Sequence, residues 1–223
     1  MNRSLILPLI LLLLGVACGP GQKQEPPPPA KEVSTMPALE DENTLNARLN
    51  RLAPVELGAD LSGLGSGDRQ ALDKLVAAAD LIQEIFLLQV DSRNPEWRKA
   101  LAQSQDTRAR LARELFDVHA GPWDRTDEQH PFMAVGSKRP GAGFYPPELT
   151  REALEAWLET HPGMRDTALS NFTLLESSEG TLTPVPYSVA YHSRLEQAAR
   201  LLREAADLTP NASLKAYLCS RAD

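Results

Sequence analysis

The histidines are the residues of this chain best suited to hold a metal ion or carry a proton, and their spacing limits what they can do. There are four of them: His119, His130, His161 and His192. The helix of a typical metallopeptidase carries His-Glu-x-x-His, which places two imidazoles on one face with a general base beside them. No two histidines here lie three to five residues apart. Their spacing therefore does not predict a zinc site.

One histidine has an acidic neighbour at helical spacing. His192 and Glu196 are four residues apart in a stretch that we expect to be helical, so the two side chains could share one ion. Two ligands do not complete a metal site. We favour the interpretation that they form an ion pair on an exposed helix face.

The candidate nucleophiles lack the surroundings that would activate them. The glycines around Ser66 and Ser137 belong to loops, whereas a Gly-x-Ser-x-Gly elbow joins a strand to a helix. Cys219 lies in a predicted helix with no nearby histidine, which favours a buried or inert thiol. The glycines from Gly63 to Gly67 are not followed by the Lys-Ser/Thr of a phosphate-binding loop. We assign no catalytic residue and no metal ligand.

The N-terminus has the pattern of an export signal. An apolar run from Leu5 to Leu14, broken only by Pro8, is shorter than the about 20 residues that a membrane-spanning helix needs. The next residues, Leu14-Gly-Val-Ala-Cys18, resemble the lipobox of bacterial lipoproteins, in which the cysteine receives diacylglycerol, the signal peptide is cut off and the new amine is acylated. An ordinary cleaved signal with an incidental cysteine is the alternative.

We therefore expect residues 1–17 to be a lipoprotein signal peptide and Cys18 to be lipidated, with membrane lipid as its partner. Several acyl chains hold a protein to a bilayer far more firmly than one. Gly19, in place of aspartate, favours the outer membrane, facing the periplasm, by the sorting preference of such lipoproteins. Residues 18–45 include four consecutive prolines and form a predicted extended tether. Residues 46–223 are the predicted folded body.

The composition favours helices and argues against one class of partner. Apolar residues make up 42% of the 223 residues and aromatic residues only 5%, with alanine and leucine dominant. The net charge of −7 and the interspersed signs argue against nucleic-acid binding, which needs clustered Lys and Arg. If Cys18 carries lipid, Cys219 has no intramolecular partner, so we predict no disulfide.

Apolar periodicity predicts most of the elements of the body. Apolar residues recur every three or four positions between Asp68, a predicted N-cap, and Asp91, and again from Tyr187 to Ala206. We expect shorter helices within 45–61, and after Asn94-Pro95, Asp106, Thr150 and Thr209-Pro210. Two short runs, 172–176 and 181–185, predict one hairpin. The predicted fold class is mainly α: a helical bundle-like lobe with one small β-hairpin and a long ordered Pro/Gly/aromatic loop.

That loop covers residues 121–147. Its density of proline and glycine argues against any regular element, yet its aromatic residues are too apolar for a free linker. We expect it to be ordered by those aromatics, and long ordered loops often carry function. Trp123, Phe144 and Tyr145 mark a possible binding loop for peptides or a protein partner.

Three stretches resemble the N-terminal region of peptidase family M49, the dipeptidyl peptidase III-like zinc hydrolases. They are Phe116-Asp-Val-His-Ala-Gly-Pro-Trp-Asp-Arg125, Lys138-Arg-Pro-Gly-Ala-Gly-Phe-Tyr-Pro146 and Val185-Pro-Tyr-Ser-Val-Ala-Tyr191. The resemblance runs from about Leu61 to Asp223, and bacterial members of the family are often lipoproteins. It implies a two-lobed enzyme with zinc held by a His-Glu-x-x-Gly-His helix and a later glutamate. Those segments lie downstream of the matched stretches, so no family site residue is carried over to this chain.

Three functions follow as hypotheses. The resemblance implies the N-terminal part of a membrane-tethered M49-like peptidase, truncated before the zinc motif, inactive alone and without a cofactor; its partner would be the missing C-terminal portion. The helix after Thr209-Pro210 reaches Asp223 with no closing turn, which fits truncation as well as a frayed tail. The second hypothesis is a non-enzymatic lipoprotein that binds a peptide or protein through residues 121–147. The third, a self-contained enzyme, lacks a catalytic constellation.

Overall fold

The structure, a computed structural model, describes residues 36–178 and 180–223. The expected signal peptide, Cys18 and residues 19–35 of the expected tether lie outside the described residues. The described elements follow one another along the chain as α1 (Glu42–Leu49), α2 (Ser66–Val90), α3 (Asn94–Gln103), α4 (Thr107–His119), β1 (Trp123–Asp124), β2 (His130–Pro131), α5 (Arg151–Thr160), the 3-10 turn η1 (Pro162–Met164), α6 (Arg165–Ala168), β3 (Thr173–Ser178), β4 (Thr181–Pro186), α7 (Tyr187–Ala190), α8 (His192–Leu208) and α9 (Ala212–Ala222). The mainly α fold class is confirmed.

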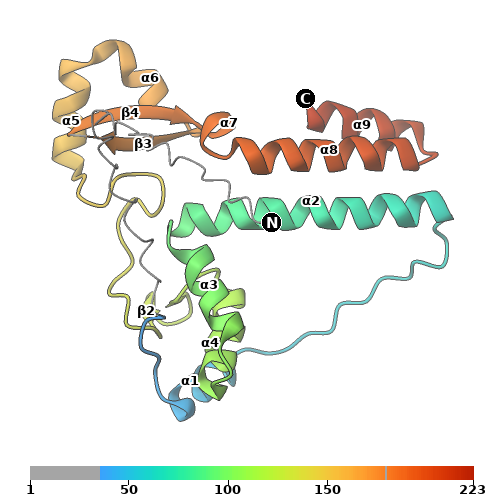
Figure 1. The fold of residues 1–223 in the computed structure, drawn as a ribbon, viewed down its shortest axis with the longest axis horizontal. Helices are drawn as coiled ribbons and strands as arrows, with labels where there is room; N and C mark the ends of the chain where they lie inside the picture. Colours follow the sequence, from blue (N-terminus) through green and yellow to red (C-terminus); the bar gives the residue numbers. More distant parts are fainter. Residues whose placement is uncertain (1–35, 179) are drawn as a thin grey trace, which may run out of the picture. The chain divides into compact units, whose positions relative to one another are not determined.

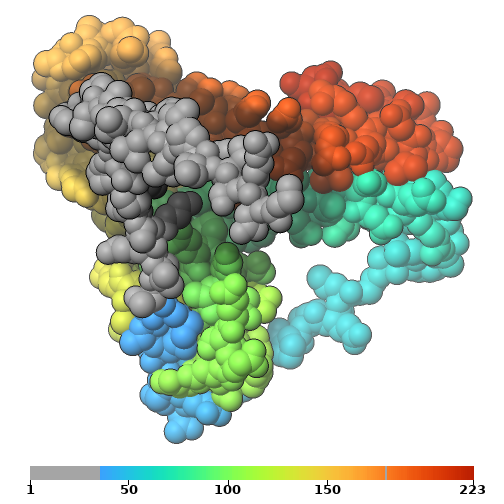
Figure 2. Space-filling model, in the orientation of Figure 1, coloured from blue at the N-terminus to red at the C-terminus, as the bar shows by residue number. Residues whose placement is uncertain are grey.

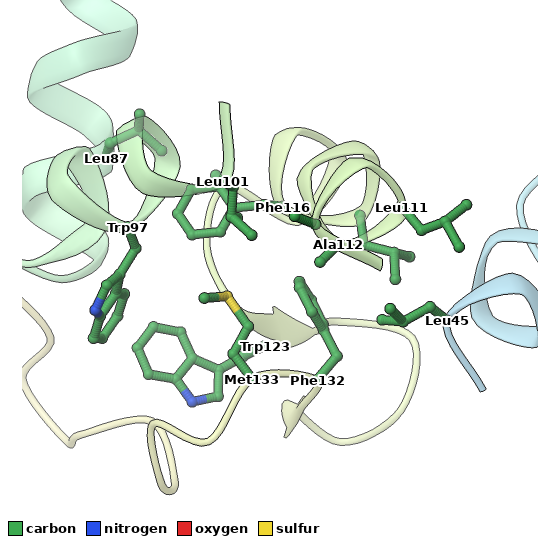
Figure 3. Close-up of a cluster of buried hydrophobic side chains, with 13 residues drawn as sticks. Leu45, Leu87, Trp97, Leu101, Leu111, Ala112, Phe116, Trp123, Phe132 and Met133 are labelled. Atoms are coloured by element: carbon green, nitrogen blue, oxygen red, sulfur yellow. The ribbon is translucent and has the colours of Figure 1, made fainter. Parts of the chain in front are cut away.

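The largest apolar core lies where α1, α3 and α4 meet the loop of residues 121–147 (Figure 3). Phe116 of α4 and Phe132 of the loop are fully buried there, and Trp97 of α3 meets Trp123 edge to face with ring centroids 6.2 Å apart. Leu45 of α1 is also fully buried, and Met36 and Leu39 pack against the same core. The compact unit therefore includes residues that the sequence analysis assigned to the tether.

A second core lies between α2, α8 and α9, where α8 runs alongside α2 (Figure 1). Its buried residues are small: Ala71 faces Ala205 and Ala206, which allows the helix backbones to approach closely. Gly67 contacts the carbonyl of Leu208, where any larger residue would overlap. Leu218 of α9 completes this core, with the half-buried thiol of Cys219 packed beside it.

The predicted hairpin is confirmed as β3 and β4. They pair antiparallel over six residues each, from Thr173 opposite Pro186 to Ser178 opposite Thr181. On its other edge, β3 is joined to the loop, because Leu175 N donates to Phe144 O at 2.9 Å. Leu175 also packs with Leu158 of α5, so the hairpin is held on both sides.

Several helix boundaries confirm the predictions. Asp106 caps α4 by accepting from Arg108 N, and Thr150 caps α5 by accepting from Ala153 N. Pro95 occupies the first turn of α3, where a missing N–H costs nothing. The helix expected to end near Asp91 ends at Val90.

Other boundaries were predicted wrongly. Asp68 is not the cap of α2, which begins at Ser66 after Gly65; its carboxylate instead accepts from the Thr209 hydroxyl at 2.7 Å. The stretch from Tyr187 to Ala206 is not one helix, because the backbone leaves helical geometry at Tyr191 and separates α7 from α8. The last helix is capped by Asn211 rather than started at Thr209-Pro210.

The loop of residues 121–147 is ordered, as expected, but it does contain a regular element. Trp123 and Asp124 pair antiparallel with Pro131 and His130, so β1 and β2 form a second, very short strand pair. The turn between them is closed by Glu128 and Gln129 in left-handed geometry, with Gln129 N bonded to Asp124 O. Proline and glycine thus limit the pair to two residues on each strand without preventing it.

The helices of the described ranges include none that is both long and apolar enough to cross a bilayer. The longest, α2, carries charged residues along its length.

Gly143 is the tightest point between the loop and α2, and it provides a test of that contact. A β-carbon on Gly143 would overlap the carbonyl oxygen of Leu88, while Gly143 N donates to Gln89 O at 2.9 Å. We predict that Gly143→Ala lowers the free energy of unfolding by about 1–3 kcal/mol, because the loop must move away from α2. Urea denaturation measures the loss.

Gly163→Ala is the matched control, since no atom lies within 4 Å of the place that the added methyl group would occupy. It should change stability by less than about 0.5 kcal/mol. Equal effects of the two substitutions would show that the loop does not contact α2 at Gly143.

Candidate functional site

The three aromatic residues of the predicted binding loop have different surroundings. Trp123 is buried, and its Nε1 donates to Gly136 O at 2.9 Å, so the indole serves the core. Phe144 is half-buried and stacks on Tyr187 with ring centroids 6.4 Å apart. Tyr145 is 36% exposed. The structure therefore brings only Tyr145 of the three to the surface, and a binding role for the loop stays a prediction.

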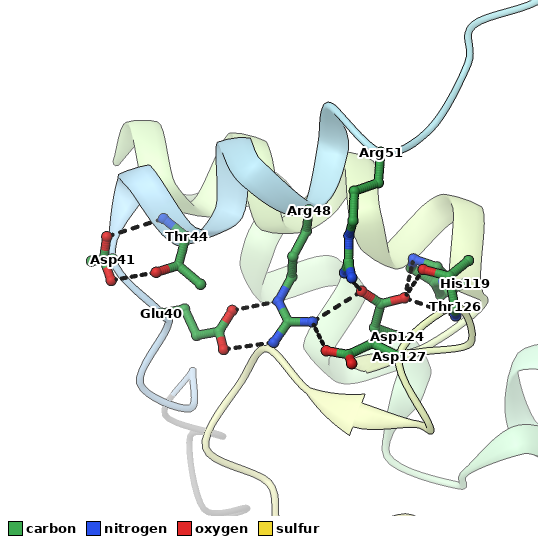
Figure 4. A network of polar contacts seen from close by, with 9 residues as sticks. All are labelled: Glu40, Asp41, Thr44, Arg48, Arg51, His119, Asp124, Thr126 and Asp127. Atoms are coloured by element: carbon green, nitrogen blue, oxygen red, sulfur yellow. Dashed lines mark hydrogen bonds and ion pairs between the residues drawn. The ribbon is translucent and has the colours of Figure 1, made fainter.

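The start of the loop is held by a buried carboxylate, Asp124, which is 1% exposed (Figure 4). Its Oδ2 accepts from Arg48 Nη1 of α1 at 2.9 Å and also from Arg51. The guanidinium of Arg48 is itself buried and is held by Glu40 through two bonds, at 2.7 and 2.9 Å, and by Asp127 at 2.9 Å. Arg48 thereby joins two segments that are far apart in sequence, residues 40–48 and residues 124–127.

The other oxygen of Asp124 faces the loop and α4. Thr126 donates to Oδ1 through both its backbone N–H, at 2.9 Å, and its hydroxyl, at 2.6 Å. Burial of Asp124 opposes its ionisation, but the hydrogen bonds from Thr126 and Arg48 outweigh that cost and lower its pKa. Asp124 is therefore a carboxylate that accepts bonds from several donors.

His119 lies next to this carboxylate but is not poised for catalysis. Its Nε2 is 3.5 Å from Asp124 Oδ1, and its Nδ1 accepts from Arg125 N at 3.3 Å. Burial lowers the pKa of His119 more than the neighbouring Asp124 raises it, so the ring is neutral, with its proton on Nε2. The Thr126 hydroxyl donates to the carboxylate and not to the imidazole, so the hydroxyl–histidine pair of an activated nucleophile is not formed here. The bonds of this cluster join α1, α4 and the start of the loop.

A second buried carboxylate, Asp91, follows α2. It accepts from Arg93 Nε and Nη2, both at 2.9 Å, and from Arg139 Nη2 of the loop at 3.1 Å. Burial opposes the ionisation of Asp91, but the hydrogen bonds from Arg93 outweigh it and lower the pKa. The middle of the loop is thus tied to α2 by charge, as its start is tied to α1.

The best candidate for ligand binding is a groove of about 540 Å³ beside Tyr145. It lies between the loop, the end of α2 and strand β3. Among its lining residues are Leu88, Tyr145, Glu148, Glu176, Ser177 and Tyr191. Its walls are partly apolar, and its two glutamates are exposed, a combination that suits a ligand with an apolar part and a cationic group. None of these residues forms a nucleophile–base pair.

The remaining histidines lie apart. His192 and Glu196 form an exposed pair, 3.7 Å apart, as the surface interpretation expected. His161 stacks on Trp157 with ring centroids 4.6 Å apart, and His130 is exposed in β2. Across residues 36–178 and 180–223, His, Cys, Asp and Glu side chains form no group of three or more that could hold a metal ion. The donor set does not fit zinc.

Sequence reasoning missed the residues that hold the loop. Arg48, Asp91, Asp124 and Arg139 are charged residues without periodicity, and the sequence offers no sign of which one meets which. The only available signal was that Asp124 and Arg139 fall inside the stretches that carry the M49 resemblance. That signal singles out the two residues but does not show which residue each one pairs with.

Comparison with known proteins gives a consistent picture. No family model matches the chain. Nudix hydrolase 3 of Arabidopsis thaliana is 27% identical over 233 aligned positions, which cover 81% of this chain and 30% of that protein. The solved structure of dipeptidyl peptidase III from Caldithrix abyssi is 39% identical, with a TM-score of 0.76 over 79% of this chain and 34% of that one. That of Corallococcus sp. strain EGB is 35% identical, with a TM-score of 0.77 over 83% and 35%.

Solved structures of dipeptidyl peptidase III from two organisms thus share both sequence and fold with this chain. The chain carries a dipeptidyl peptidase III-like N-terminal region. It spans about a third of the length of the relatives that it matches. The resemblance to family M49 is confirmed at this level, and the described region is peptidase-related.

The buried carboxylate offers a test of what holds the loop of the dipeptidyl peptidase III-like region. Asp124→Asn keeps the size of the side chain but removes the charge opposite Arg48 and Arg51. We predict a loss of about 3 kcal/mol in the free energy of unfolding, because Arg48 is left buried with less compensation. Urea denaturation of the full chain measures it.

Asp117→Asn is the matched control. Asp117 pairs with Arg98 at 2.6 Å, but the two side chains are 39% and 45% exposed, so the loss should stay below about 1 kcal/mol. A loss at Asp124 no larger than that at Asp117 would show that the buried network does not hold the loop.

Proposed function

We propose that this chain is the N-terminal part of a membrane-tethered, dipeptidyl peptidase III-like protein, a part that contributes to peptide handling but holds no zinc and hydrolyses no peptide by itself. The observation that carries the proposal is the joint match in sequence and fold to two dipeptidyl peptidase III structures. It is supported by the arrangement of the described side chains, among which His, Cys, Asp and Glu form no group of three or more that could hold a metal ion. The sequence also contains no His-Glu-x-x-Gly-His stretch.

The groove beside Tyr145 gives the peptide-related role a physical basis. An extended peptide has a backbone that can hydrogen-bond and, at its start, an ammonium group that Glu148 or Glu176 could attract. Tyr145 adds an aromatic surface at low entropic cost. The same groove supports the second candidate function, which is peptide binding by a non-enzymatic lipoprotein.

The tether rests on the N-terminal sequence. The stretch ending at Cys18 resembles a lipobox, and the prolines after it suit an extended spacer between lipid and body. With Gly19 after the cysteine, the proposed location is the outer membrane, facing the periplasm.

One prediction from this proposal concerns hydrolysis. The full chain, purified in detergent and supplied with zinc, should release no dipeptide from unblocked peptides and should retain only substoichiometric zinc after dialysis, because the described side chains supply no third ligand. Amine detection and elemental analysis measure both quantities, and the Caldithrix abyssi enzyme serves as the active control.

Turnover that a chelator abolishes and zinc restores would overturn this part of the proposal. If the activity also disappeared in His192→Ala, it would be traced to the exposed pair of His192 and Glu196. Saturable peptide binding without hydrolysis, weakened by Tyr145→Ala, would favour the non-enzymatic candidate.

Another prediction from this proposal concerns the anchor. Cells that express the full chain and are fed labelled palmitate should incorporate the label, and Cys18→Ser should abolish incorporation. Cys219→Ser is the matched control and should keep the label, because it removes the other thiol of the chain. Label that persists in Cys18→Ser, or disappears in Cys219→Ser, contradicts acylation at Cys18.

A further inference from the structure

The segment that joins α1 to α2 is exposed along nearly all of its length. This connector, residues 53–65, contains no helix or strand (Figure 1), and every residue from 53 to 63 is exposed. Leu57 is 90% exposed and Val55 74%. Apart from chain neighbours, no described atom lies within 4 Å of where a β-carbon on Gly58 or Gly63 would be. Figure 2 shows the connector in cyan as a narrow chain with open space beside it.

The backbone of the connector is equally open. Within the described part of the chain, no backbone N–H or C=O between residues 53 and 60 takes part in a hydrogen bond. An endopeptidase binds its substrate as an extended chain, whose backbone groups must be free to bond to the enzyme. A stretch with an open backbone is therefore where a first cut is expected.

The loop of residues 121–147 is longer but is tied down at intervals. Phe132 N donates to Pro122 O at 3.0 Å, and Gly143 N donates to Gln89 O at 2.9 Å. Each of these bonds must break before the loop can adopt the extended course that an endopeptidase needs. Length alone therefore does not make a segment open to cutting, and the connector differs from the loop in its bonding.

The chain before the connector is firmly held. Residues 36–52, which we call the strap, include α1, and Leu45 of α1 is fully buried. The other apolar residues of the strap that pack against the largest core are Met36, Leu39, Leu49 and Leu52. The backbone of the strap is joined to the loop, because Ala134 N donates to Ala38 O at 2.8 Å. That core includes no residue of the connector.

Ion pairs hold the strap to the loop as well (Figure 4). Arg48, which is 8% exposed, donates to Asp124 and Asp127, both at 2.9 Å. Arg51 also donates to Asp124. Separating the strap from the loop would leave Asp124 without these two donors, and a buried charge that loses its partner is costly.

We propose that the connector is a processing site and that the strap is a noncovalent latch. An endopeptidase adds water across one peptide bond between residues 53 and 60, leaving a carboxylate on the strap piece and an amine on the body piece, which carries α2 to α9. The latch then keeps the two pieces together. With the tether of the proposed function, on which this last step rests, the cut body stays at the membrane until the latch opens.

Limited proteolysis tests the processing site. Glutamyl endopeptidase, which cuts after glutamate, is added to the full chain in detergent, and the pieces are identified by mass. The first cut within residues 36–223 should follow Glu56, and Glu56→Gln should remove it. Glu148→Gln is the matched control at an exposed glutamate near the end of the loop, and it should leave the cut unchanged. A first cut elsewhere in this range overturns the site.

Size-exclusion chromatography of the cut protein, over a dilution series, tests the latch. The two pieces should elute together at neutral pH. Leu45→Ala should weaken their association at least about tenfold, because it leaves a cavity in the core. Leu57→Ala is the matched control, with the same substitution at a leucine that is almost fully exposed, and it should leave the association unchanged.

Thermal melting of the uncut variants shows whether each one folds. If Leu45→Ala does not fold, Arg48→Met takes its place, since it removes the charge opposite Asp124 and keeps an apolar stem of similar length. Pieces of the wild-type chain that separate on cutting overturn the latch. So does a folded strap variant whose pieces stay together as firmly as those of the wild-type chain.

Sedimentation with membranes separates this proposal from the proposed function. After cutting, the wild-type body piece should sediment with membranes, and the Leu45→Ala body piece should be released. A body piece that elutes with the strap but does not sediment with membranes supports the latch and counts against the tether. An uncut chain that sediments with membranes, but whose pieces separate on cutting, supports the tether and rejects the latch.

Discussion

The ionised side chain of Asp124 is the contact on which the arrangement of the largest core depends. A carboxylate almost without exposure is tolerated only when donors surround it, and here Thr126, Arg48 and Arg51 supply them from two separate segments. Because Arg48 belongs to α1 and Asp124 to the loop, the same bonds fix where α1 lies. The aromatic core with Trp123 and Phe132 is therefore enclosed by α1, α3, α4 and the loop.

A buried carboxylate paired with arginine also holds the second half of the loop. Asp91 is equally buried at the end of α2, and its bond from Arg139 determines where residues 138–147 begin to cross toward β3. Gly143 then allows the backbone to contact α2, and Phe144 O joins the edge of β3. The groove beside Tyr145 exists because these three contacts hold the loop across two elements. A site of this kind depends on backbone approach and buried charge more than on any single binding residue.

The sequence predicted what is local and missed what is long-range. Helix periodicity found α2 and α8, and capping chemistry found the starts of α4 and α5, because such signals involve neighbours within a turn or two. The pairings of Asp124 with Arg48 and of Asp91 with Arg139 span 76 and 48 positions, and no spacing rule connects them. Asp68 shows the same limit, since a residue expected to cap its own helix bonds instead to Thr209. For the candidate site, the loop and Tyr145 were found from composition, whereas the walls contributed by α2 and β3 were not.

The apolar pattern of α2 carries more information than its helical assignment. Its periodicity predicts a single apolar stripe that includes Val76, Ile82 and Phe86, yet the structure divides the apolar residues of α2 between a face packed on α8 and a face exposed to solvent. Burying an apolar side chain stabilises a fold by about 1.5–3 kcal/mol, so an exposed stripe forgoes that contribution unless something covers it. Apolar periodicity therefore predicts that α2 is helical, but it does not tell which of its apolar residues are packed and which are exposed.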